Sequence, residues 1–468
     1  MIISYYNFSL NKNSYHVTIY YDSDEKYLIL FINNQIFKKD GIQMKKSTKD
    51  SIVIGFALFS MFFGAGNLIF PGFLGNSLGS DFLLGTIGFV VTGVGLPLLA
   101  IVACSKGDGT FESIGNRIDR KFILIFTTVL FLAIGPLMAV PRTAATTFEL
   151  SVNPFLPNVP AIVAITVYFA INLFFVLKKS AIVDTIGKFL TPALLILLIV
   201  LIVKGIVSPI GEIVNTNASA VLSTSLIEGY QTMDALGALL FASIVTTSLK
   251  DKGYRGKEMP KMIFKSSLVA AIGLAFVYGG LMYIGAQTSG LVSQEIGKTG
   301  LLLLISESVL GKVGPAIIGL AMGLACLSTS IGLVSVGASF FEKISKGKLS
   351  YNLNAIVITI ISLAVATLGV DKIVALSGPV LNLLYPVSIT IIVTTLMSKY
   401  LKNMKAVRLG IYTSLVFSLL LLIPGLNISF LPLADLGFGW VVPTVLSIII
   451  GIIIFKEKTT ESSLEKAA

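Results

Sequence analysis

Long apolar runs alternate with short polar, mostly basic segments from residue 51 to residue 455. A run of about 20 apolar residues has the length of a helix that crosses the hydrocarbon core of a bilayer. Twelve such runs predict an all-α polytopic membrane protein with 12 transmembrane helices, at 51–71, 82–104, 122–140, 161–177, 189–207, 226–249, 262–284, 313–340, 355–370, 374–396, 410–423 and 438–455. A shorter run at 301–309 predicts a re-entrant or interfacial helix.

The composition agrees with a protein that is embedded in lipid. Of the 468 residues, 54% are hydrophobic and 13% are charged, and the mean hydropathy is +0.89. A soluble domain carries about 25% charged residues. The composition therefore excludes a soluble globular enzyme, and the predicted spans leave no length for a large catalytic domain outside the membrane.

Basic residues are distributed unevenly between the two sides of the predicted topology. With the N-terminus placed in the cytoplasm, 26 of the 35 Lys and Arg residues fall in inner segments and 5 on the outer side. Because cytoplasmic loops are enriched in Lys and Arg, this distribution predicts a multi-pass protein of the cell membrane with both termini in the cytoplasm. The net charge of +11 thus follows from topology and does not indicate nucleic-acid binding.

Residues 1–43 differ from the rest of the chain. They are polar, contain the single histidine, His16, and show only short strand-like runs such as 27–32. They lack the basic head and apolar core of a signal peptide. We therefore expect an atypical N-terminal extension at 1–43 and a membrane transporter domain at 44–468, with Met44 as the natural start. A small cytoplasmic extension is the alternative.

The first apolar run contains residues that disrupt a helix. Gly64, Gly66, Asn67 and Pro71 lie in its middle or just beyond. Glycine weakens a helix and proline removes a backbone donor, and unwound backbone at membrane depth is tolerated only where it lines an enclosed or wet cavity. The run therefore predicts a discontinuous first helix. The alternative is that the glycines only allow close helix packing.

The sixth run contains a second candidate break. Its start is polar and includes Glu228 and Asp234, and a carboxylate within a span marks a functional site. The alternative is that Asp234 caps the start of a helix. Discontinuous helices 1 and 6, five helices apart, predict a five-plus-five inverted repeat with a binding site at the membrane midplane.

The two breaks together suit a zwitterionic amino acid, because helix-terminal N–H groups bind a carboxylate and exposed carbonyl groups bind an ammonium. Apart from Arg142, predicted near the outer end of the third helix, no intramembrane Lys or Arg is available for a second acidic group. Apolar surroundings then favour leucine, isoleucine or valine. The substrate-binding residues expected are Gly64, Ala65, Gly66 and Asn67 in the first helix and Tyr230, Thr232, Met233 and Asp234 in the sixth.

The eighth run carries three consecutive hydroxyl residues, Ser328, Thr329 and Ser330. Neutral hydroxyl and carbonyl oxygens are suitable ligands for a hard cation such as Na⁺ that must bind and leave repeatedly. Alternatively, each hydroxyl bonds to a carbonyl one turn earlier in its own helix. Three hydroxyls in succession opposite a broken first helix favour the cation site.

Four motifs resemble those of the BrnQ-type branched-chain amino acid:cation symporters, which are members of the amino acid/polyamine/organocation superfamily. They lie at 55–71, 135–144, 232–236 and 325–332, and the first is long and specific. The resemblance covers the chain after Met44. It implies a secondary active transporter that imports branched-chain amino acids by symport with Na⁺ or H⁺, through two five-helix repeats and two further helices.

The resemblance also implies a sodium site. Its ligands would be the backbone carbonyls of Ser60, Phe63 and Ala325 and the hydroxyls of Ser328 and Thr329. Apart from the coupling ion it implies no cofactor, and apart from the amino acid and membrane lipid it implies no nucleic acid and no obligatory protein partner. Without an intramembrane histidine, proton coupling would depend largely on Asp234. The sequence leaves Na⁺ and H⁺ both open.

Three other functions remain as alternatives. A carrier of the same fold for another neutral amino acid differs only in its side-chain pocket. An intramembrane enzyme needs a catalytic dyad or metal ligands at membrane depth, whereas the apolar runs hold no histidine and only two separated cysteines, Cys104 and Cys326. A channel is the third alternative. The chain contains no repeated filter sequence, which argues against a channel.

Overall fold

The computed structural model describes residues 2–10, 13–21, 29–32, 46–115, 118–178, 191–292, 296–423 and 430–455. The chain forms two compact units, Met1–Lys49 and Asp50–Ala468. In the first unit, strands β1 (Ile2–Leu10), β2 (Asn13–Tyr21) and β3 (Ile29–Ile32) form an antiparallel sheet in that order. Two of these strands are longer than the short runs expected from the sequence. The division at residue 43 stays a prediction.

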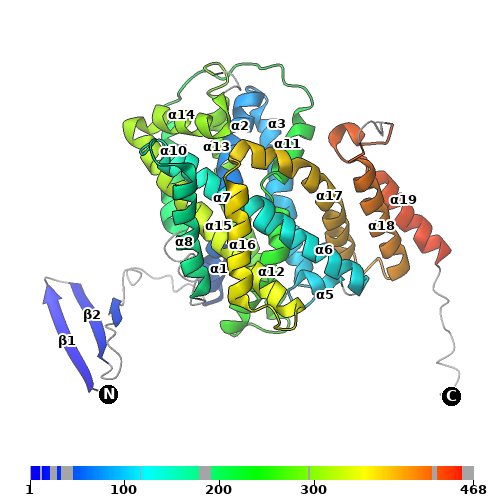
Figure 1. Ribbon diagram of the computed structural model, residues 1–468, viewed down its shortest axis with the longest axis horizontal. Helices are drawn as coiled ribbons and strands as arrows, with labels where there is room; N and C mark the ends of the chain where they lie inside the picture. Colours follow the sequence, from blue (N-terminus) through cyan, green and yellow to red (C-terminus); the bar gives the residue numbers. More distant parts are fainter. Residues whose placement is uncertain are drawn as a thin grey trace. The chain divides into compact units, whose positions relative to one another are not determined.

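Each of the twelve apolar runs contains a helix in the second unit, and several runs are divided between helices (Figure 1). The helices are α1 (Lys46–Phe62), α2 (Ala65–Leu78), α3 (Phe82–Val90), α4 (Leu96–Cys104), α5 (Phe111–Gly115), α6 (Arg120–Leu132), α7 (Val140–Thr147), α8 (Ala161–Leu177), α10 (Thr191–Val207), α11 (Val221–Tyr230), α12 (Asp234–Asp251), α13 (Glu258–Ala286), α14 (Lys298–Leu310), α15 (Gly314–Ile344), α16 (Tyr351–Ala366), α17 (Val370–Leu396), α18 (Met404–Leu420) and α19 (Val441–Ile454). Three short π-helical turns lie between or after these helices. Val91–Gly95 joins α3 to α4, Ala133–Ala139 joins α6 to α7, and Phe148–Val152 follows α7.

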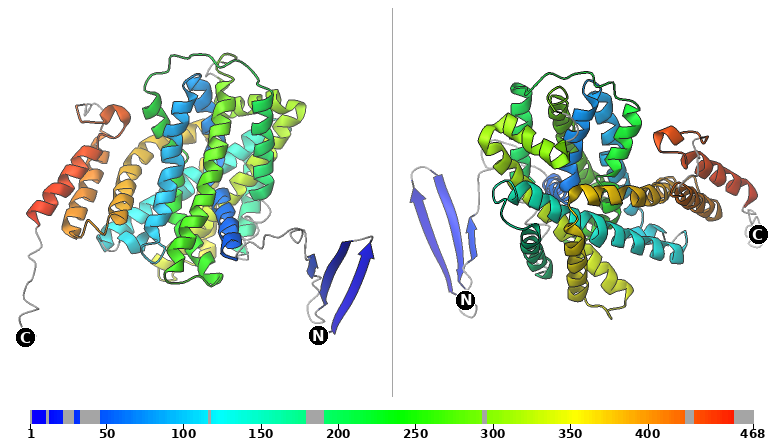
Figure 2. Two further views of the ribbon diagram at one scale, coloured as in Figure 1. Left: turned by 180° about the vertical axis from the view of Figure 1, so that it is seen from behind. Right: turned by 45° about the horizontal axis from the view of Figure 1, so that its top comes forward.

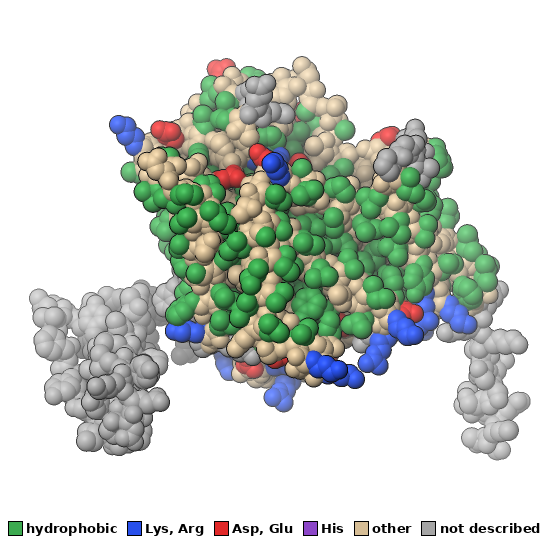
Figure 3. All heavy atoms as spheres, viewed as in Figure 1, with side chains coloured by type: hydrophobic (Ala, Val, Ile, Leu, Met, Phe, Trp, Pro, Cys, Tyr) green, Lys and Arg blue, Asp and Glu red, His purple; other side chains and the backbone are tan. Residues whose placement is uncertain are grey.

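The helical unit has the surface of a multi-pass membrane protein. Six of its described helical segments are long and apolar enough to cross a bilayer, or seven if the bent pair α1 and α2 counts as one span, and four more apolar helices have 10–17 residues. Hydrophobic side chains cover the middle of the surface, whereas Lys and Arg gather at one end (Figure 3). We call this the basic end; α5 and the loop after α12 lie there. The number of twelve spans and the inverted repeat stay predictions.

The first apolar run is broken between α1 and α2, whose axes differ in direction by 71°. Only Phe63 and Gly64 lie outside both helices, and Pro71 lies within α2. The break is therefore shorter than the stretch of disruptive residues in the sequence. Pro71 is the seventh residue of α2 and lacks the N–H that would bond to the carbonyl four residues earlier, yet the helix continues to Leu78.

The sixth run is broken between α11 and α12, at 231–233. Met233 adopts a left-handed backbone conformation with φ of 65°, which is uncommon for a residue with a long side chain. Such conformations persist only where the surrounding structure holds them, and they cluster at functional sites. Both predicted discontinuities are thus present in the structure.

Glycines let α2 approach α13 closely. A Cβ atom on Gly75 would overlap the Met282 carbonyl, and one on Gly285 would overlap the backbone of Gly72. The other central helix, α15, packs against α7, α10, α12 and α16, whereas α18 and α19 pair with each other at the edge of the unit (Figure 2). This packing surrounds the two breaks with other helices.

The run predicted as a re-entrant or interfacial helix forms α14, which packs on α2 and α15. It lies at the end of the unit opposite the basic end (Figure 1). It therefore covers the far end of α2, beyond the break.

Candidate functional site

A buried carboxylate links the two broken helices. Asp234, the first residue of α12, accepts a hydrogen bond at Oδ2 from Asn67 Nδ2 of α2 at 2.6 Å and another from the Tyr278 hydroxyl of α13 at 2.9 Å. Asn67 Nδ2 also donates to the Tyr278 hydroxyl. At the start of α12 it is the Thr232 hydroxyl that accepts a hydrogen bond from the Asp234 backbone N–H, at 3.3 Å. The structure therefore does not support Asp234 as a cap; its carboxylate joins α2, α12 and α13.

Asn67 also shapes the first break. Its Oδ1 accepts a hydrogen bond from the Gly64 backbone N–H at 3.0 Å, so this side chain satisfies one donor that the unwinding frees. The N–H groups of Ala65 and Gly66 lie in the first turn of α2, where no carbonyl of the helix can accept from them. The N-terminus of a helix carries a partial positive charge, so this turn is suited to a carboxylate.

Carbonyl groups at the second break already have donors. Arg142 Nη1 donates to the Gln231 carbonyl at 2.8 Å and Nη2 donates to the Thr232 carbonyl at 3.4 Å. The Tyr385 hydroxyl donates to the Tyr230 carbonyl at 2.9 Å. Side chains from α7 and α17 thus already donate to three of these carbonyls. A carbonyl oxygen can accept a second hydrogen bond, so the expectation that carbonyls here bind the substrate ammonium stays a prediction.

The sequence places Arg142 near the outer end of the third predicted helix, and this placement is wrong. The third apolar run continues through π-helical turns to residue 152, so Arg142 lies well within it and reaches the second break. Only 3% of the residue is exposed. A buried guanidinium beside both breaks is a major part of the site's charge.

A small cavity of about 30 Å³ lies between the two breaks. A volume of this size holds about one water molecule. Six of the eight expected substrate-binding residues line it, namely Gly64, Ala65, Asn67, Thr232, Met233 and Asp234, and the lining also includes Arg142, Phe241 and Thr329. Gly66 instead faces Phe70 and Arg142. Tyr230 stacks on Tyr385, with ring centroids 4.0 Å apart.

The residues expected at a cation site gather where α1 meets α15. The Ser60 carbonyl accepts from the Ser328 hydroxyl at 3.1 Å and from the Thr329 hydroxyl at 3.3 Å, and Ser328 Oγ lies 2.9 Å from the Ala325 carbonyl. Phe63 is in the same stretch, with its ring stacked on Phe59. Ser328 thus bonds both to its own helix and to α1, and the cation site stays a prediction.

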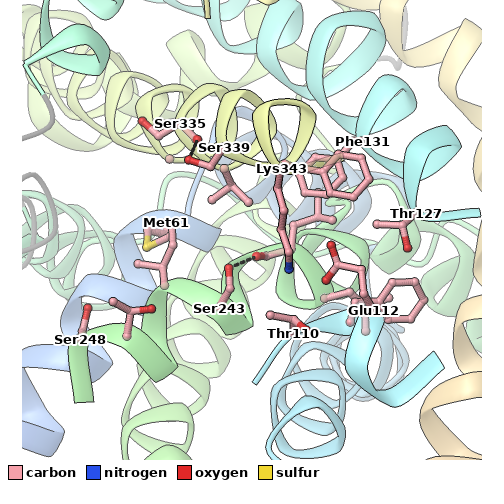
Figure 4. Close-up of a pocket in the computed structure, with 18 of the residues that line it drawn as sticks. Met61, Thr110, Glu112, Thr127, Phe131, Ser243, Ser248, Ser335, Ser339 and Lys343 are labelled. Atoms are coloured by element: carbon pink, nitrogen blue, oxygen red, sulfur yellow. Dashed lines mark hydrogen bonds between the residues drawn. The ribbon is translucent and has the colours of Figure 1, made fainter. Parts of the chain in front are cut away.

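A much larger cavity of about 860 Å³ opens beside α12 and α15 (Figure 4). Met61 and Gly332 lie at its inner part, and Asp251, Lys252 and Lys343 lie toward the basic end. Because Met61 also lines the small cavity, the large cavity extends from the basic end to the first break.

Phe70 of α2 lies on the side of the site toward α14. Its ring lies between two cations, with the Arg142 guanidinium carbon 5.4 Å and Lys298 Nζ 5.5 Å from the ring centroid. Lys298 of α14 also lies 3.8 Å from the Phe73 centroid and 4.0 Å from Glu228. Phe70 is buried in this surrounding, with 1% of the residue exposed.

Sequence reasoning missed Tyr278 and underestimated Arg142. Tyr278 lies in an apolar run without proline, and its signal in the sequence is a single hydroxyl within a long helix. Arg142 carried a stronger signal, since an intramembrane arginine is a functional-site candidate wherever it lies.

Comparisons with known proteins show which family the chain belongs to. Residues 47–458 match the family model described as branched-chain amino acid transport protein. The branched-chain amino acid permeases BrnQ and BraB of Bacillus subtilis are 36% and 35% identical over 89% and 87% of this chain and 99% and 95% of their own lengths. The branched-chain amino acid transport system 2 carrier protein of Pseudomonas aeruginosa is 34% identical over 86% of this chain and 95% of its own length.

Solved structures share the fold at low sequence identity. MhsT in complex with L-phenylalanine has a TM-score of 0.56 and 16% identity, with 86% of this chain and 98% of MhsT covered. A nucleobase-cation-symport-1 family transporter, in a closed conformation with bromovinylhydantoin bound, has a TM-score of 0.58 and 16% identity, with 86% of this chain and 91% of its own covered. The helical unit thus has the fold of these two transporters.

Proposed function

The chain belongs to the family of branched-chain amino acid transport proteins, and from that premise we propose that it imports leucine, isoleucine and valine by symport with a cation. Its relatives are named permeases and carriers, not enzymes. The basic end faces the cytoplasm of the cell in this proposal, because Lys and Arg accumulate on that side of membrane proteins.

The observation that carries the proposal is the meeting of two broken helices at one buried cavity. The positive N-terminus of α2 and the Asp234 carboxylate lie at its wall. A zwitterionic amino acid presents a carboxylate and an ammonium, and it needs one partner of each kind. Apolar groups such as Met233 and Phe241 also line the cavity and suit a branched aliphatic side chain.

The large cavity toward the basic end and the buried Phe70 toward α14 support alternating access. In this proposal the structure is the inward-facing form, and the outward-facing form opens past Phe70. The small cavity holds about one water molecule, so side chains such as Arg142 and Phe241 must move to admit leucine. The large cavity is the cytoplasmic half of the pathway.

Cysteines in the large cavity test this pathway. We expect Ser243→Cys and Ser339→Cys to react with an impermeant maleimide in inside-out vesicles, because both positions line the cavity, and to react more slowly when leucine and Na⁺ shift the protein outward. Both native cysteines are buried. Ser418→Cys, buried on α18, is the matched control and should stay unmodified. Equal labelling from both membrane sides would contradict the inward-facing form.

We propose that Na⁺ is the coupling ion and binds among the oxygens of Ser60, Phe63, Ala325, Ser328 and Thr329. Ser60 lies in the last turn of α1 and Phe63 directly follows that helix, and carbonyls at a helix C-terminus carry a partial negative charge that attracts a cation. Neutral oxygens allow the repeated release that transport requires.

Thr329→Ala tests the cation site. Loss of one neutral ligand is worth about 1 to 3 kcal/mol, so the Na⁺ concentration for half-maximal leucine uptake should rise at least fivefold. Thr359→Ala is the matched control, because that hydroxyl bonds to the Ala355 carbonyl of its own helix. An unchanged Na⁺ dependence in Thr329→Ala and in Ser328→Ala, at normal expression, would contradict the assignment.

Uptake into proteoliposomes tests the function as a whole. Purified protein should accumulate labelled leucine when an inward Na⁺ gradient is imposed, and an H⁺ gradient alone should not support accumulation. Unlabelled isoleucine and valine should compete, whereas alanine, glutamate and phenylalanine should compete weakly. Preferred competition by phenylalanine would instead support a carrier of the same fold for another neutral amino acid.

A further inference from the structure

We propose that Arg142 and Asp234 are the two poles that recognise the substrate zwitterion: the Arg142 guanidinium binds its carboxylate and the Asp234 carboxylate binds its ammonium. This assignment rests on the proposed function and specifies how that site recognises its substrate. The sequence predicts a site that binds the substrate mainly through backbone groups. This assignment adds one positively and one negatively charged side chain.

The Arg142 guanidinium has unused hydrogen-bonding capacity at the cavity. Nη1 and Nη2 donate to the carbonyls of Gln231 and Thr232, but the buried Nε–H has no partner. A buried donor without a partner carries a free-energy cost, and most such groups in folded proteins are satisfied. Arg142 lines the small cavity. A substrate carboxylate there would satisfy the guanidinium and neutralise its charge.

The two charges face the same cavity but do not pair. Arg142 and Asp234 both line it, and no ion pair within 4.0 Å joins them among the described residues. Asp234 is held by two neutral donors, Asn67 and Tyr278. Isolated buried charges are costly, and a pair separated by a cavity favours a ligand that carries both opposite charges. An α-amino acid has this charge pattern.

The occupied carbonyls decide which group receives the ammonium. Tyr385 and Arg142 already donate to the carbonyls of Tyr230, Gln231 and Thr232. Asp234 then remains as the carboxyl acceptor at the cavity. The carboxylate is directed to the other wall, where Gly66 brings the first turn of α2 against Arg142: a Cβ atom on Gly66 would lie 2.9 Å from Arg142 Nη2.

A purely structural role is the competing explanation for Arg142, since it also holds the unwound segment between α11 and α12. The two roles differ in how they respond to the ligand. Loss of a structural support weakens the binding of every ligand, whereas loss of a carboxylate partner weakens only ligands that carry a carboxylate. L-Leucinamide, which keeps the ammonium and side chain of leucine but lacks the carboxylate, therefore separates them.

The experiment measures binding of labelled leucine, and its displacement by leucinamide, on purified full-length protein. Wild-type protein should bind leucine much more tightly than leucinamide. In Arg142→Gln, the loss of a charge-assisted hydrogen bond should weaken leucine binding about 30-fold and leave leucinamide binding unchanged or tighter. Arg255→Gln is the matched control, because Arg255 is exposed in the loop after α12, and should match wild type.

Arg142→Lys keeps the test decisive if Arg142→Gln does not fold. Lysine retains the charge but not the planar fork of donors, so this variant should still prefer leucine to leucinamide, with weaker leucine binding. Equal loss of both ligands in the Arg142 variants would overturn the assignment and leave Arg142 a structural support. Wild-type protein that binds no leucine under any ion condition would overturn the proposed function itself.

Discussion

Asp234→Asn should lower leucine affinity at least about 100-fold, since removing one partner of a buried charge interaction costs roughly 3 to 5 kcal/mol. Asparagine has the same shape and keeps an oxygen for Asn67 and Tyr278, which both donate to Asp234. The fold should therefore survive. The substitution removes only the negative charge of Asp234, which we propose binds the substrate ammonium.

Equilibrium binding of labelled leucine to purified protein provides the measurement. Asp81→Asn is the matched control, because Asp81 precedes α3 and makes no capping hydrogen bond with its side chain. This control should bind leucine as wild type does. Near-normal leucine affinity in a well-folded Asp234→Asn protein would show that the ammonium binds elsewhere.

The same variant separates two roles of the carboxylate. If Asp234 carries a proton during transport, Asp234→Asn should keep leucine binding and leucine exchange but lose accumulation driven by an H⁺ gradient. If Asp234 binds the ammonium, exchange and accumulation should be lost together. Our proposal predicts the second result, with Na⁺ dependence determined at the Ser60, Ser328 and Thr329 cluster.

The arrangement of the helices could be predicted from sequence to a large extent, because the hydrophobic pattern is a local property. A run of apolar residues specifies a helix whatever its neighbours, and each of the twelve runs contains one. The positions of the breaks were also predictable from Gly64 and Asp234. The exact length of the first break was not, because Pro71 is compatible with the early turns of α2.

The partners within the site depend on residues far apart in the chain. Asp234 and Asn67 are separated by 167 residues, and Arg142 reaches carbonyls 89 and 90 residues away. No local pattern specifies these pairings. The donors to the carbonyls at 230–232 could not be predicted for this reason, since nothing near them in the sequence shows that Tyr385 and Arg142 donate to them.

Gly66→Ala is the second variant for which we expect a large effect, and the structure supplies a reason that the sequence did not. An added Cβ would lie 2.7 Å from Phe70 Cε2 and 2.9 Å from Arg142 Nη2. Both atoms are at the far ends of side chains, so they can shift without disrupting the helix. The substitution should therefore displace Arg142 and Phe70, and leave α2 folded.

We expect Gly66→Ala to be produced at normal abundance with leucine affinity reduced roughly 100-fold, the effect of displacing a binding group by about 1 Å.

Two other glycines serve as controls for this variant, one on the tolerant side and one on the intolerant side. Gly279→Ala should be neutral, because its Cβ would lie 3.6 Å from Thr86 Cγ2, whereas Gly75→Ala should prevent folding, because its Cβ would overlap the backbone of α13. Thermal stability and leucine binding of the three purified variants separate packing from binding. Wild-type affinity in a stable Gly66→Ala protein would refute the site between the two breaks, because a binding group at its wall would have moved without consequence.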